Sequence, residues 1–175
     1  IAAFSGSHRH VIDYLTEEVL AQQPPDIHEF LSQTAILDRL TASLCNAVTG
    51  RDDGERLLRR LEQANLFLAP LDDERQWYRY HRLFADFMRN HLSNEAPDLM
   101  RTLHRRAAAW YAQRAMPSEA IEHALRAADF ETAAQWIEHT AVAMLMRSEA
   151  TTLLKWLKAL PQPLIAARPM LNLIY

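Results

Sequence analysis

The sequence predicts a mainly α-helical protein, in which a winged-helix domain with one small β-hairpin precedes a helical, repeat-like segment. Two patterns predict this fold class. Apolar residues recur at helical spacing through most of the 175 residues, and the period changes once, between residues 66 and 80. The composition agrees, because three glycines are fewer than an all-β fold usually needs for its turns.

Four helices are predicted before the period changes. Pro24-Pro25 ends the first helix, because proline lacks the backbone N–H and clashes with the preceding turn. Asp26 is expected to cap the second helix and Thr41 the third, which Gly50 ends. The fourth begins near Asp52–Asp53. The apolar stripes of these helices are Val11, Tyr14, Leu15 and Val19; Ile27, Phe30 and Leu31; Leu44, Cys45 and Val48; and Leu57, Leu58, Leu61 and Leu66.

The interruption reads as a β-hairpin. Residues 66–69 form a short apolar run that Pro70 closes, residues 71–75 form an acidic turn, and residues 77–80 are rich in aromatic side chains, which favour strands. Helical spacing returns with Leu83 and continues to Leu92. Three helices, a two-stranded wing and a further helix are the element order of a winged-helix domain.

The residues after the break at 94–97 are helical in pattern and rich in alanine. Four apolar stripes follow, the last of which Pro161 ends: Leu103, Ala107, Trp110 and Tyr111; Ala120, Ile121, Ala124 and Leu125; Ala133, Ala134, Ile137 and Ala141; and Leu153, Leu154, Trp156, Leu157 and Leu160. The run AAAW at 107–110 is echoed by AAQW at 133–136. Small residues beside a bulky aromatic are typical of stacked helical hairpins, so a repeat-like array is predicted.

Composition and motifs exclude several functions for this stretch of chain. It contains neither GxxxxGK[ST] nor GxGxxG, so it is not expected to hold a nucleotide by a glycine-rich loop of its own. A single cysteine excludes an internal disulfide, and no run of about 18 apolar residues predicts a membrane helix. We therefore expect a cytoplasmic location. Because the chain starts at Ile1 and stops within an apolar run, we also expect an internal piece of a longer protein.

Most residues with catalytic or metal-binding chemistry have a plainer explanation. His8 and His10 lack further ligands nearby, and His123 and His139 are expected to be surface or helix-packing residues, so no metal site is predicted. Cys45 lies on an apolar helix face and is expected to be a buried, unreactive thiol. The consecutive acids at 72–74 point in different directions and suit a solvated turn rather than a catalytic carboxylate pair.

Direct DNA binding by the winged helix is an alternative that the charges oppose. The helix that begins near residue 52 is the third of the predicted winged helix and would enter the major groove. It contains Arg56, Arg59 and Arg60. It also carries Asp52, Asp53, Glu55 and Glu62, the wing tip is acidic, and the net charge of the chain is −3. These carboxylates would repel phosphates.

His81 is the most distinctive candidate for a functional residue. It is predicted to lie where the second wing strand ends and the next helix begins, a place suited to binding anions. An imidazole can donate a hydrogen bond to a phosphate in either charge state. The alternative is a histidine that caps the helix and packs on Tyr78 or Tyr80.

Several runs resemble the MalT-like group of large ATP-binding LuxR-type transcriptional regulators, which belong to the signal-transduction ATPases with numerous domains. The resemblance covers nearly the whole chain. The runs that carry it are FLSQTAILDRL at 30–40, LCNAVTG at 44–50, LRRLEQANLFLAPL at 58–71, WYRYHRLF at 77–84, LHRRAAAWY at 103–111 and EAIEHAL at 119–125.

The resemblance implies a domain order. Residues 1–25 would end a helical linker domain, residues 26–96 would be the winged helix, and residues 97–175 would be a helical arm and the start of a helical-repeat sensor. The nucleotide-binding domain and the C-terminal DNA-binding domain would lie outside the chain. ATP or ADP would then be the cofactor of the full-length protein and not of this segment.

The resemblance also implies a role for His81. In related ATPases a Met-His-Asp motif at the end of the winged helix contacts the β-phosphate of ADP and holds the resting state. Residues 80–82 are similar to it, with Arg82 in place of the aspartate, so His81 and Arg82 become the expected nucleotide-sensing residues.

The leading hypothesis from the sequence is a regulatory segment that is not itself an enzyme and that couples nucleotide state to a ligand-sensing helical-repeat domain. Its expected partners are its own nucleotide-binding domain, the sensor repeats with their inducer, a second copy on activation, and DNA only through the C-terminal domain; no membrane partner is expected. The alternatives are a helical-repeat adaptor for protein–protein interaction and direct DNA binding. The sequence identifies neither the inducer nor the promoters.

Overall fold

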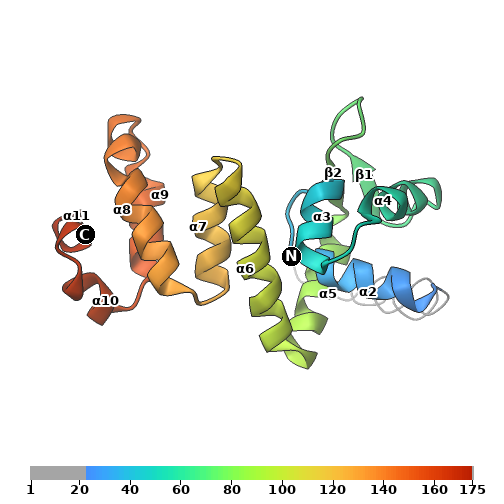
Figure 1. The fold of residues 1–175 in the computed structure, drawn as a ribbon, viewed down its shortest axis with the longest axis horizontal. Helices are drawn as coiled ribbons and strands as arrows, with labels where there is room; N and C mark the ends of the chain where they lie inside the picture. The colour runs from blue at the N-terminus through green and yellow to red at the C-terminus, as the bar shows by residue number, and fades with distance from the viewer. Residues whose placement is uncertain (1–22, 175) are drawn as a thin grey trace, which may run out of the picture. The chain divides into compact units, whose positions relative to one another are not determined.

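A computed structural model describes residues 23–174 of the chain. The chain divides into two compact units, residues 1–100 and residues 101–175. The helix predicted at residues 11–19 and the histidines at 8 and 10 lie outside the described residues. Figure 1 labels the elements of both units, which are described here one at a time.

The described part of the first unit is a winged helix. Helices α2 (Pro25–Thr34), α3 (Ala42–Thr49) and α4 (Gly54–Gln63) precede strands β1 (Leu68–Pro70) and β2 (Tyr78–Tyr80), and α5 (Arg82–Glu95) follows. The strands are antiparallel, with Leu68 opposite Tyr80 and Pro70 opposite Tyr78. The predicted order of elements, and the mainly α fold class with a small hairpin, are therefore confirmed.

A third extended segment completes the wing, which sequence reasoning did not foresee. Leu40 and Tyr78 exchange both backbone hydrogen bonds, at 2.8 and 2.9 Å, so β2 lies between β1 and residue 40. This pairing ties the wing to the segment that joins α2 to α3. The wing is therefore held on two sides.

The helix ends of the first unit agree with the sequence in part. Thr41 caps α3 through its Oγ1, which accepts the Leu44 N–H at 3.2 Å, and Gly50 ends α3 in the left-handed region at φ 77°. Asp26 does not cap α2: Pro24 is the capping residue and Asp26 lies within the first turn. Pro25 begins this helix, since its fixed φ suits the first helical position and its missing N–H costs no hydrogen bond there.

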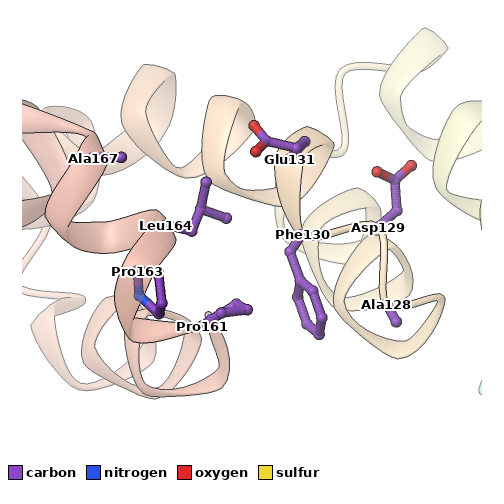
Figure 2. A pocket seen from close by; sticks show the side chains of 8 residues that line it. All are labelled: Ala128, Asp129, Phe130, Glu131, Pro161, Pro163, Leu164 and Ala167. Atoms are coloured by element: carbon purple, nitrogen blue, oxygen red, sulfur yellow. The ribbon is translucent and has the colours of Figure 1, made fainter.

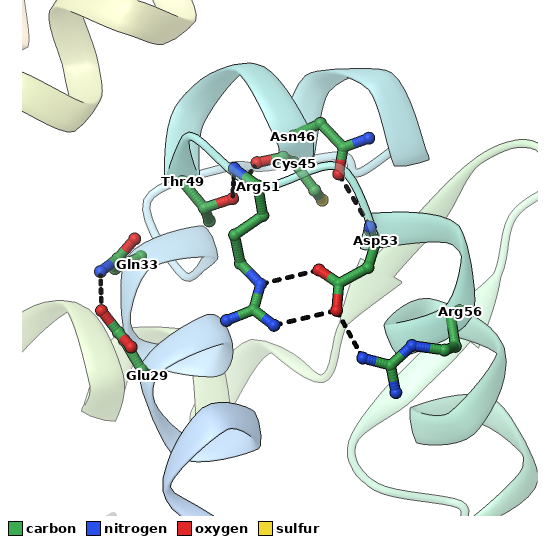
Figure 3. Close-up of polar contacts among 9 residues, drawn as sticks. Glu29, Gln33, Cys45, Asn46, Thr49, Arg51, Asp53 and Arg56 are labelled. Carbon is green, nitrogen blue, oxygen red and sulfur yellow. Dashed lines mark hydrogen bonds and ion pairs between the residues drawn. The ribbon is translucent and has the colours of Figure 1, made fainter.

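The approach of α3 to α4 depends on a glycine and a polar cluster. The Gly54 N–H donates to Asn46 Oδ1 at 2.8 Å, and a Cβ on Gly54 would lie 2.5 Å from that oxygen. Beside it, Arg51 donates two hydrogen bonds to the Asp53 carboxylate, at 2.8 and 2.9 Å, and Arg56 donates a third (Figure 3). These contacts fix the turn between the two helices.

The second unit is a series of helices joined by tight turns. Its elements are α6 (Pro97–Gln113), which begins at the end of the first unit, α7 (Pro117–Arg126), α8 (Phe130–Met146), α9 (Ala150–Ala159), α10 (Gln162–Ala167) and α11 (Pro169–Ile174). Helices α7, α8 and α9 pack on one another (Figure 1). Their shared core contains Ile121, Ile137, Leu153 and Trp156, which are at most 1% exposed. The four predicted helices are confirmed, and α10 and α11 are added.

Three successive turns of the second unit have the same backbone geometry. Ala115, Ala128 and Ser148 each adopt a positive φ of 54–63° directly after a helix. In each turn the next residue donates its N–H back across the helix end; the pairs are Met116 to Tyr111 O at 3.1 Å, Asp129 to Ala124 O at 3.0 Å, and Glu149 to Met144 O at 2.9 Å. These are Schellman caps built without glycine. The repetition expected from the sequence is therefore visible in the turns.

Candidate functional site

His81 lies at the junction between β2 and α5, as the sequence predicts. It is the residue before the first turn of α5, and its backbone carbonyl accepts the Ala85 N–H at 3.0 Å. Its side chain is exposed and makes no capping hydrogen bond to the helix. The side-chain cap in the alternative, a histidine that caps α5 and packs on Tyr78 or Tyr80, is therefore absent, and the imidazole is exposed.

The backbone of His81 is nevertheless held firmly. Its N–H donates to the Phe67 carbonyl at 2.7 Å. The Phe67 ring stacks on Phe84 of α5 with centroids 4.4 Å apart, and Phe67 itself adopts a positive φ of 56°. A bulky residue in this region is strained by about 1–2 kcal/mol, so the surrounding packing must hold it there.

A buried hydrogen bond anchors the residue before His81. The hydroxyls of Tyr80 and Thr34 lie 2.7 Å apart, and Thr34 also donates to the Phe30 carbonyl. Burial raises the pKa of the Tyr80 phenol far above its usual value, so it stays neutral. The anchor joins the wing to α2, and the exposed His81 ring therefore projects from a fixed frame.

Two arginines line the same pocket as His81. An open pocket of about 480 Å³ lies beside the wing; its lining consists of Asn65, Phe67, Leu68, Ala69, Arg79, Tyr80, His81 and Arg82. Among these described residues three are basic and none is acidic. The Arg82 side chain is 93% exposed and its Nε lies 3.8 Å from Asp86 Oδ2. An exposed pair at this distance holds the arginine only weakly, so its charge stays available to an anion.

The basic group includes one residue that the sequence reasoning missed. Arg79 lies between the buried residues Tyr78 and Tyr80, so it points to the opposite face of the strand, the face shared with His81. The alternation in Tyr78-Arg79-Tyr80-His81 is the signal that could have identified it. The N–H groups in the first turn of a helix have no partner within the helix, so together with those of α5 these side chains suit a phosphate or another anion.

Cys45 is buried, as predicted, and it is not a nucleophile. The thiol lies in the core of the first unit with no exposed surface, and burial raises its pKa far above the usual range. A thiol that stays protonated does not attack an electrophile.

The acidic wing tip is structural. The Asp72 carboxylate accepts the N–H groups of Gln76 and Trp77, at 2.8 and 3.0 Å. It stabilises the turn instead of pairing with another carboxylate, which agrees with the prediction of a solvated turn.

The face of α4 that would read DNA is neutralised by its own acids. Arg56 pairs with Asp53, and Arg59 pairs with Glu55 at 2.6 Å. Arg75 of the wing pairs with Glu62 at 3.3 Å. Phosphates would have to displace these carboxylates, which makes the α4 face a poor DNA surface.

The histidines of the second unit are packing and surface residues, as expected. His123 is buried and its Nδ1 lies 2.8 Å from Nδ1 of His104, a partner that the sequence reasoning did not identify. His139 is exposed on α8 beside the Gln135 carbonyl. Within residues 23–174, no cluster of three or more side chains is arranged to hold a metal ion.

A second pocket, of about 510 Å³, lies within the second unit between the start of α8 and α10 (Figure 2). Its lining consists of Ala128, Asp129, Phe130, Glu131, Pro161, Pro163, Leu164 and Ala167. Arg168 pairs with Glu131 at 2.7 Å and with Glu138 at 2.9 Å, and thereby fastens α10 to α8. In the part of the chain that the structure describes, no helix is both long and apolar enough to cross a bilayer.

Comparisons with known proteins agree with this architecture. The family model of the MalT winged helix domain matches residues 16–100. The HTH-type transcriptional regulator MalT of Cronobacter sakazakii is 39% identical over 170 residues, which are 94% of this chain and 18% of that protein. MalT of Vibrio campbellii is 32% identical over 169 residues, 96% of this chain and 19% of that protein.

A protein with a different name matches the same stretch. The serine/threonine-protein kinase PknK of Mycobacterium tuberculosis is 32% identical over 173 residues, which are 99% of this chain and 16% of the kinase. The chain thus spans less than a fifth of each of these relatives. The winged-helix architecture, the family match and the identities agree: residues 16–100 belong to the family of MalT winged-helix domains, and nearly the whole chain is similar to MalT regulators.

Proposed function

We propose that this chain is the coupling segment of an ATP-dependent transcriptional regulator in the cytoplasm. The winged helix responds to the nucleotide held by an upstream ATPase domain, and the second unit begins the helical-repeat sensor that binds the inducer. DNA is bound by a separate C-terminal domain, after the activated protein has formed oligomers. The segment itself performs no catalysis.

One observation carries the proposal: His81 presents an exposed imidazole on a rigid backbone, within a group of basic side chains. The Phe67 carbonyl and the Tyr80–Thr34 hydrogen bond fix the position of the residue, at 2.7 Å in both cases. The ring can therefore reach a phosphate outside this chain without an entropic cost in its backbone. Arg82 is placed to add charge to the same contact.

The relatives favour a role in passing a signal between domains over a role in catalysis or DNA binding. One is named a serine/threonine-protein kinase and others are named HTH-type transcriptional regulators, yet each contains a stretch that is 32–39% identical to this chain. A segment shared by proteins with different outputs contributes what they have in common. Signal transmission between domains is such a function.

Two states of the protein follow from the proposal. In the resting state the winged helix packs on the ATPase domain, and His81 donates a hydrogen bond to a phosphate of ADP. Inducer on the sensor favours the open state, in which this bond is absent. Each ligand shifts the equilibrium by its difference in affinity for the two states.

The test is ADP binding by a longer protein that includes the upstream ATPase domain. A hydrogen bond to a charged phosphate contributes about 1.5–3 kcal/mol, so His81→Ala is expected to weaken ADP binding about 10- to 150-fold in calorimetry. His91→Ala is the matched control, because His91 is a partly exposed histidine on the same helix that pairs with Glu95 at 3.2 Å. Equal ADP affinities in the two variants would contradict the proposal.

The second unit contains one surface that favours the adaptor alternative. Val142, Leu145 and Met146 are spaced to share one face of α8 and are 50%, 47% and 83% exposed. An apolar group of this kind can bind a protein partner. Pull-down with the longer protein, with and without Met146→Lys, separates this role from the coupling role, because the substitution leaves the His81 region untouched.

A further inference from the structure

His104 and His123 are the two buried histidines of the described residues. They are 2% and 4% exposed, and among the described residues Thr34 is the other buried residue with a polar side chain of this kind. Burying an ionisable side chain is costly unless it has a hydrogen-bond partner. The two rings, from α6 and α7 of the second unit, are hydrogen-bonded to each other through their Nδ1 atoms.

The contact fixes the protons of the pair. The two Nδ1 atoms lie 2.8 Å apart, with ring centroids 5.0 Å apart. One Nδ1 must carry a hydrogen and donate it, and the other must present its lone pair. The neutral histidines therefore take opposite tautomers, with one proton at Nδ1 of the donor ring and one at Nε2 of the acceptor ring.

Aromatic rings pack beside the pair. Tyr111 of α6 stacks on the His123 ring at 5.4 Å, and Trp110 meets Tyr111 edge-on at 5.1 Å. The charged residues one helical turn from the pair, and those of α9 that reach α7, are Arg101 on α6, Glu119, Glu122 and Arg126 on α7, and Lys155 on α9. Glu122 pairs with Arg126 at 3.8 Å and with Lys155 at 3.4 Å at the surface.

We propose that His104 and His123 form a proton-sensitive latch between α6 and α7, which is closed when the pair is neutral and opens when both rings are protonated. A first added proton goes to Nε2 of the donor ring and leaves the bridging hydrogen bond in place. A second goes to Nδ1 of the acceptor ring. Two N–H groups then face each other with their nitrogens 2.8 Å apart, and the two positive charges repel within the buried contact of α6 and α7.

The direction of the pH effect follows from the number of protons bound. Histidines exposed by opening have pKa values of about 6.5, so below that pH the open state binds one or two more protons than the closed state. The closed latch is therefore fully favoured above about pH 7 and is lost as the pH falls. Each extra proton raises the opening equilibrium about tenfold per pH unit, so an increase of about 10- to 100-fold is expected between pH 6 and pH 5.

Amide hydrogen exchange of the whole chain measures this opening. The rates of the α6 and α7 amides, corrected for the intrinsic effect of pH, are expected to rise by that factor between pH 6 and pH 5. In the double variant His104→Gln, His123→Gln, the two glutamine side chains can form a hydrogen bond that does not titrate. The rise in the exchange rate should therefore disappear. His139→Gln is the matched control and should behave as the wild type, because His139 is exposed on α8.

One result that would overturn the latch is a wild-type exchange rate that does not change with pH, or that changes as much in the double variant.

An NMR titration of the imidazole nitrogens of the wild type is a second test, and it remains decisive if the double variant does not fold. It is expected to show one Nδ1–H and one Nε2–H tautomer at pH 7.5. Protonation of both rings while the α6 and α7 amides stay protected would refute the proposal.

Discussion

Arg89 of α5 is predicted to hold the α2–α3 connection in the first unit. Its Nε donates to the Ala35 carbonyl at 2.6 Å, and its Nη2 donates to the Leu37 carbonyl at 3.3 Å and to Asp38 Oδ1 at 3.0 Å. Arg89→Met keeps most of the aliphatic stem but removes these three hydrogen bonds, together with a longer and exposed contact of Nη1 with Asp86 at 3.4 Å. The test therefore isolates the hydrogen bonds from the packing.

The expected decrease in the free energy of unfolding follows from how exposed each contact is. The Arg89 side chain is 28% exposed, so the bonds to the two carbonyls are partly shielded and contribute about 1–1.5 kcal/mol each. Asp38 is 61% exposed, and that ion pair adds at most about 0.5 kcal/mol. The sum is about 2–3 kcal/mol, which corresponds to a fall of roughly 1–2 M in the urea midpoint of a small domain.

Fluorine-labelled tryptophan can report on the first unit separately. Trp77 is the one tryptophan in residues 1–100, and the other three belong to residues 101–175. Urea titration followed by ¹⁹F NMR should show the lower midpoint at Trp77. Arg60→Met is the matched control on an exposed arginine of α4 and should stay within about 0.5 kcal/mol of the wild type. Equal midpoints for the two variants at Trp77 would refute the reasoning.

Two further predictions concern a turn and a carboxylate. Ala128 adopts a φ of 55°, so Ala128→Gly should remove left-handed strain and raise the stability of the second unit by up to about 1 kcal/mol in thermal unfolding; a lower melting temperature would show that the turn is not strained. Arg51 and Arg56 hold the pKa of Asp53 well below its usual range, so this carboxylate stabilises the fold fully above about pH 4 and loses its contribution as the pH falls further. Asp53→Asn should therefore lower stability at pH 7 and weaken its dependence on pH between 4 and 2, which acid titration of the unfolding midpoint measures; an unchanged slope would contradict this.

Much of the fold could be predicted from local pattern. The apolar spacing of each helix identifies the face that the structure buries, as with Leu44, Cys45 and Val48 on α3. The cap at Thr41 and the stop at Gly50 follow from the chemistry of single residues. Asp26 shows the limit of this reasoning, because a proline at the first helical position competes with an acidic residue for the start of the helix, and here proline decides it.

The candidate site was only partly predictable. Its location at the end of β2 and the identity of His81 follow from the change in apolar period. The exposure of the His81 ring did not follow, because it depends on what the neighbours bind: Tyr80 is drawn inward by Thr34, 46 residues away. The basic neighbour Arg79 was visible in the alternation of the strand but was overlooked.

The sequence by itself determined the element types, their order and the buried face of each helix, because these depend on residues within a turn or two of each other. Only the tertiary structure decided the pairing of Leu40 with Tyr78, the hydrogen bonds from Arg89 to the α2–α3 connection and the hydrogen bond between His104 and His123. Each of these joins residues far apart in the chain, and each arises when packed elements bring a donor to an acceptor that local periodicity does not specify.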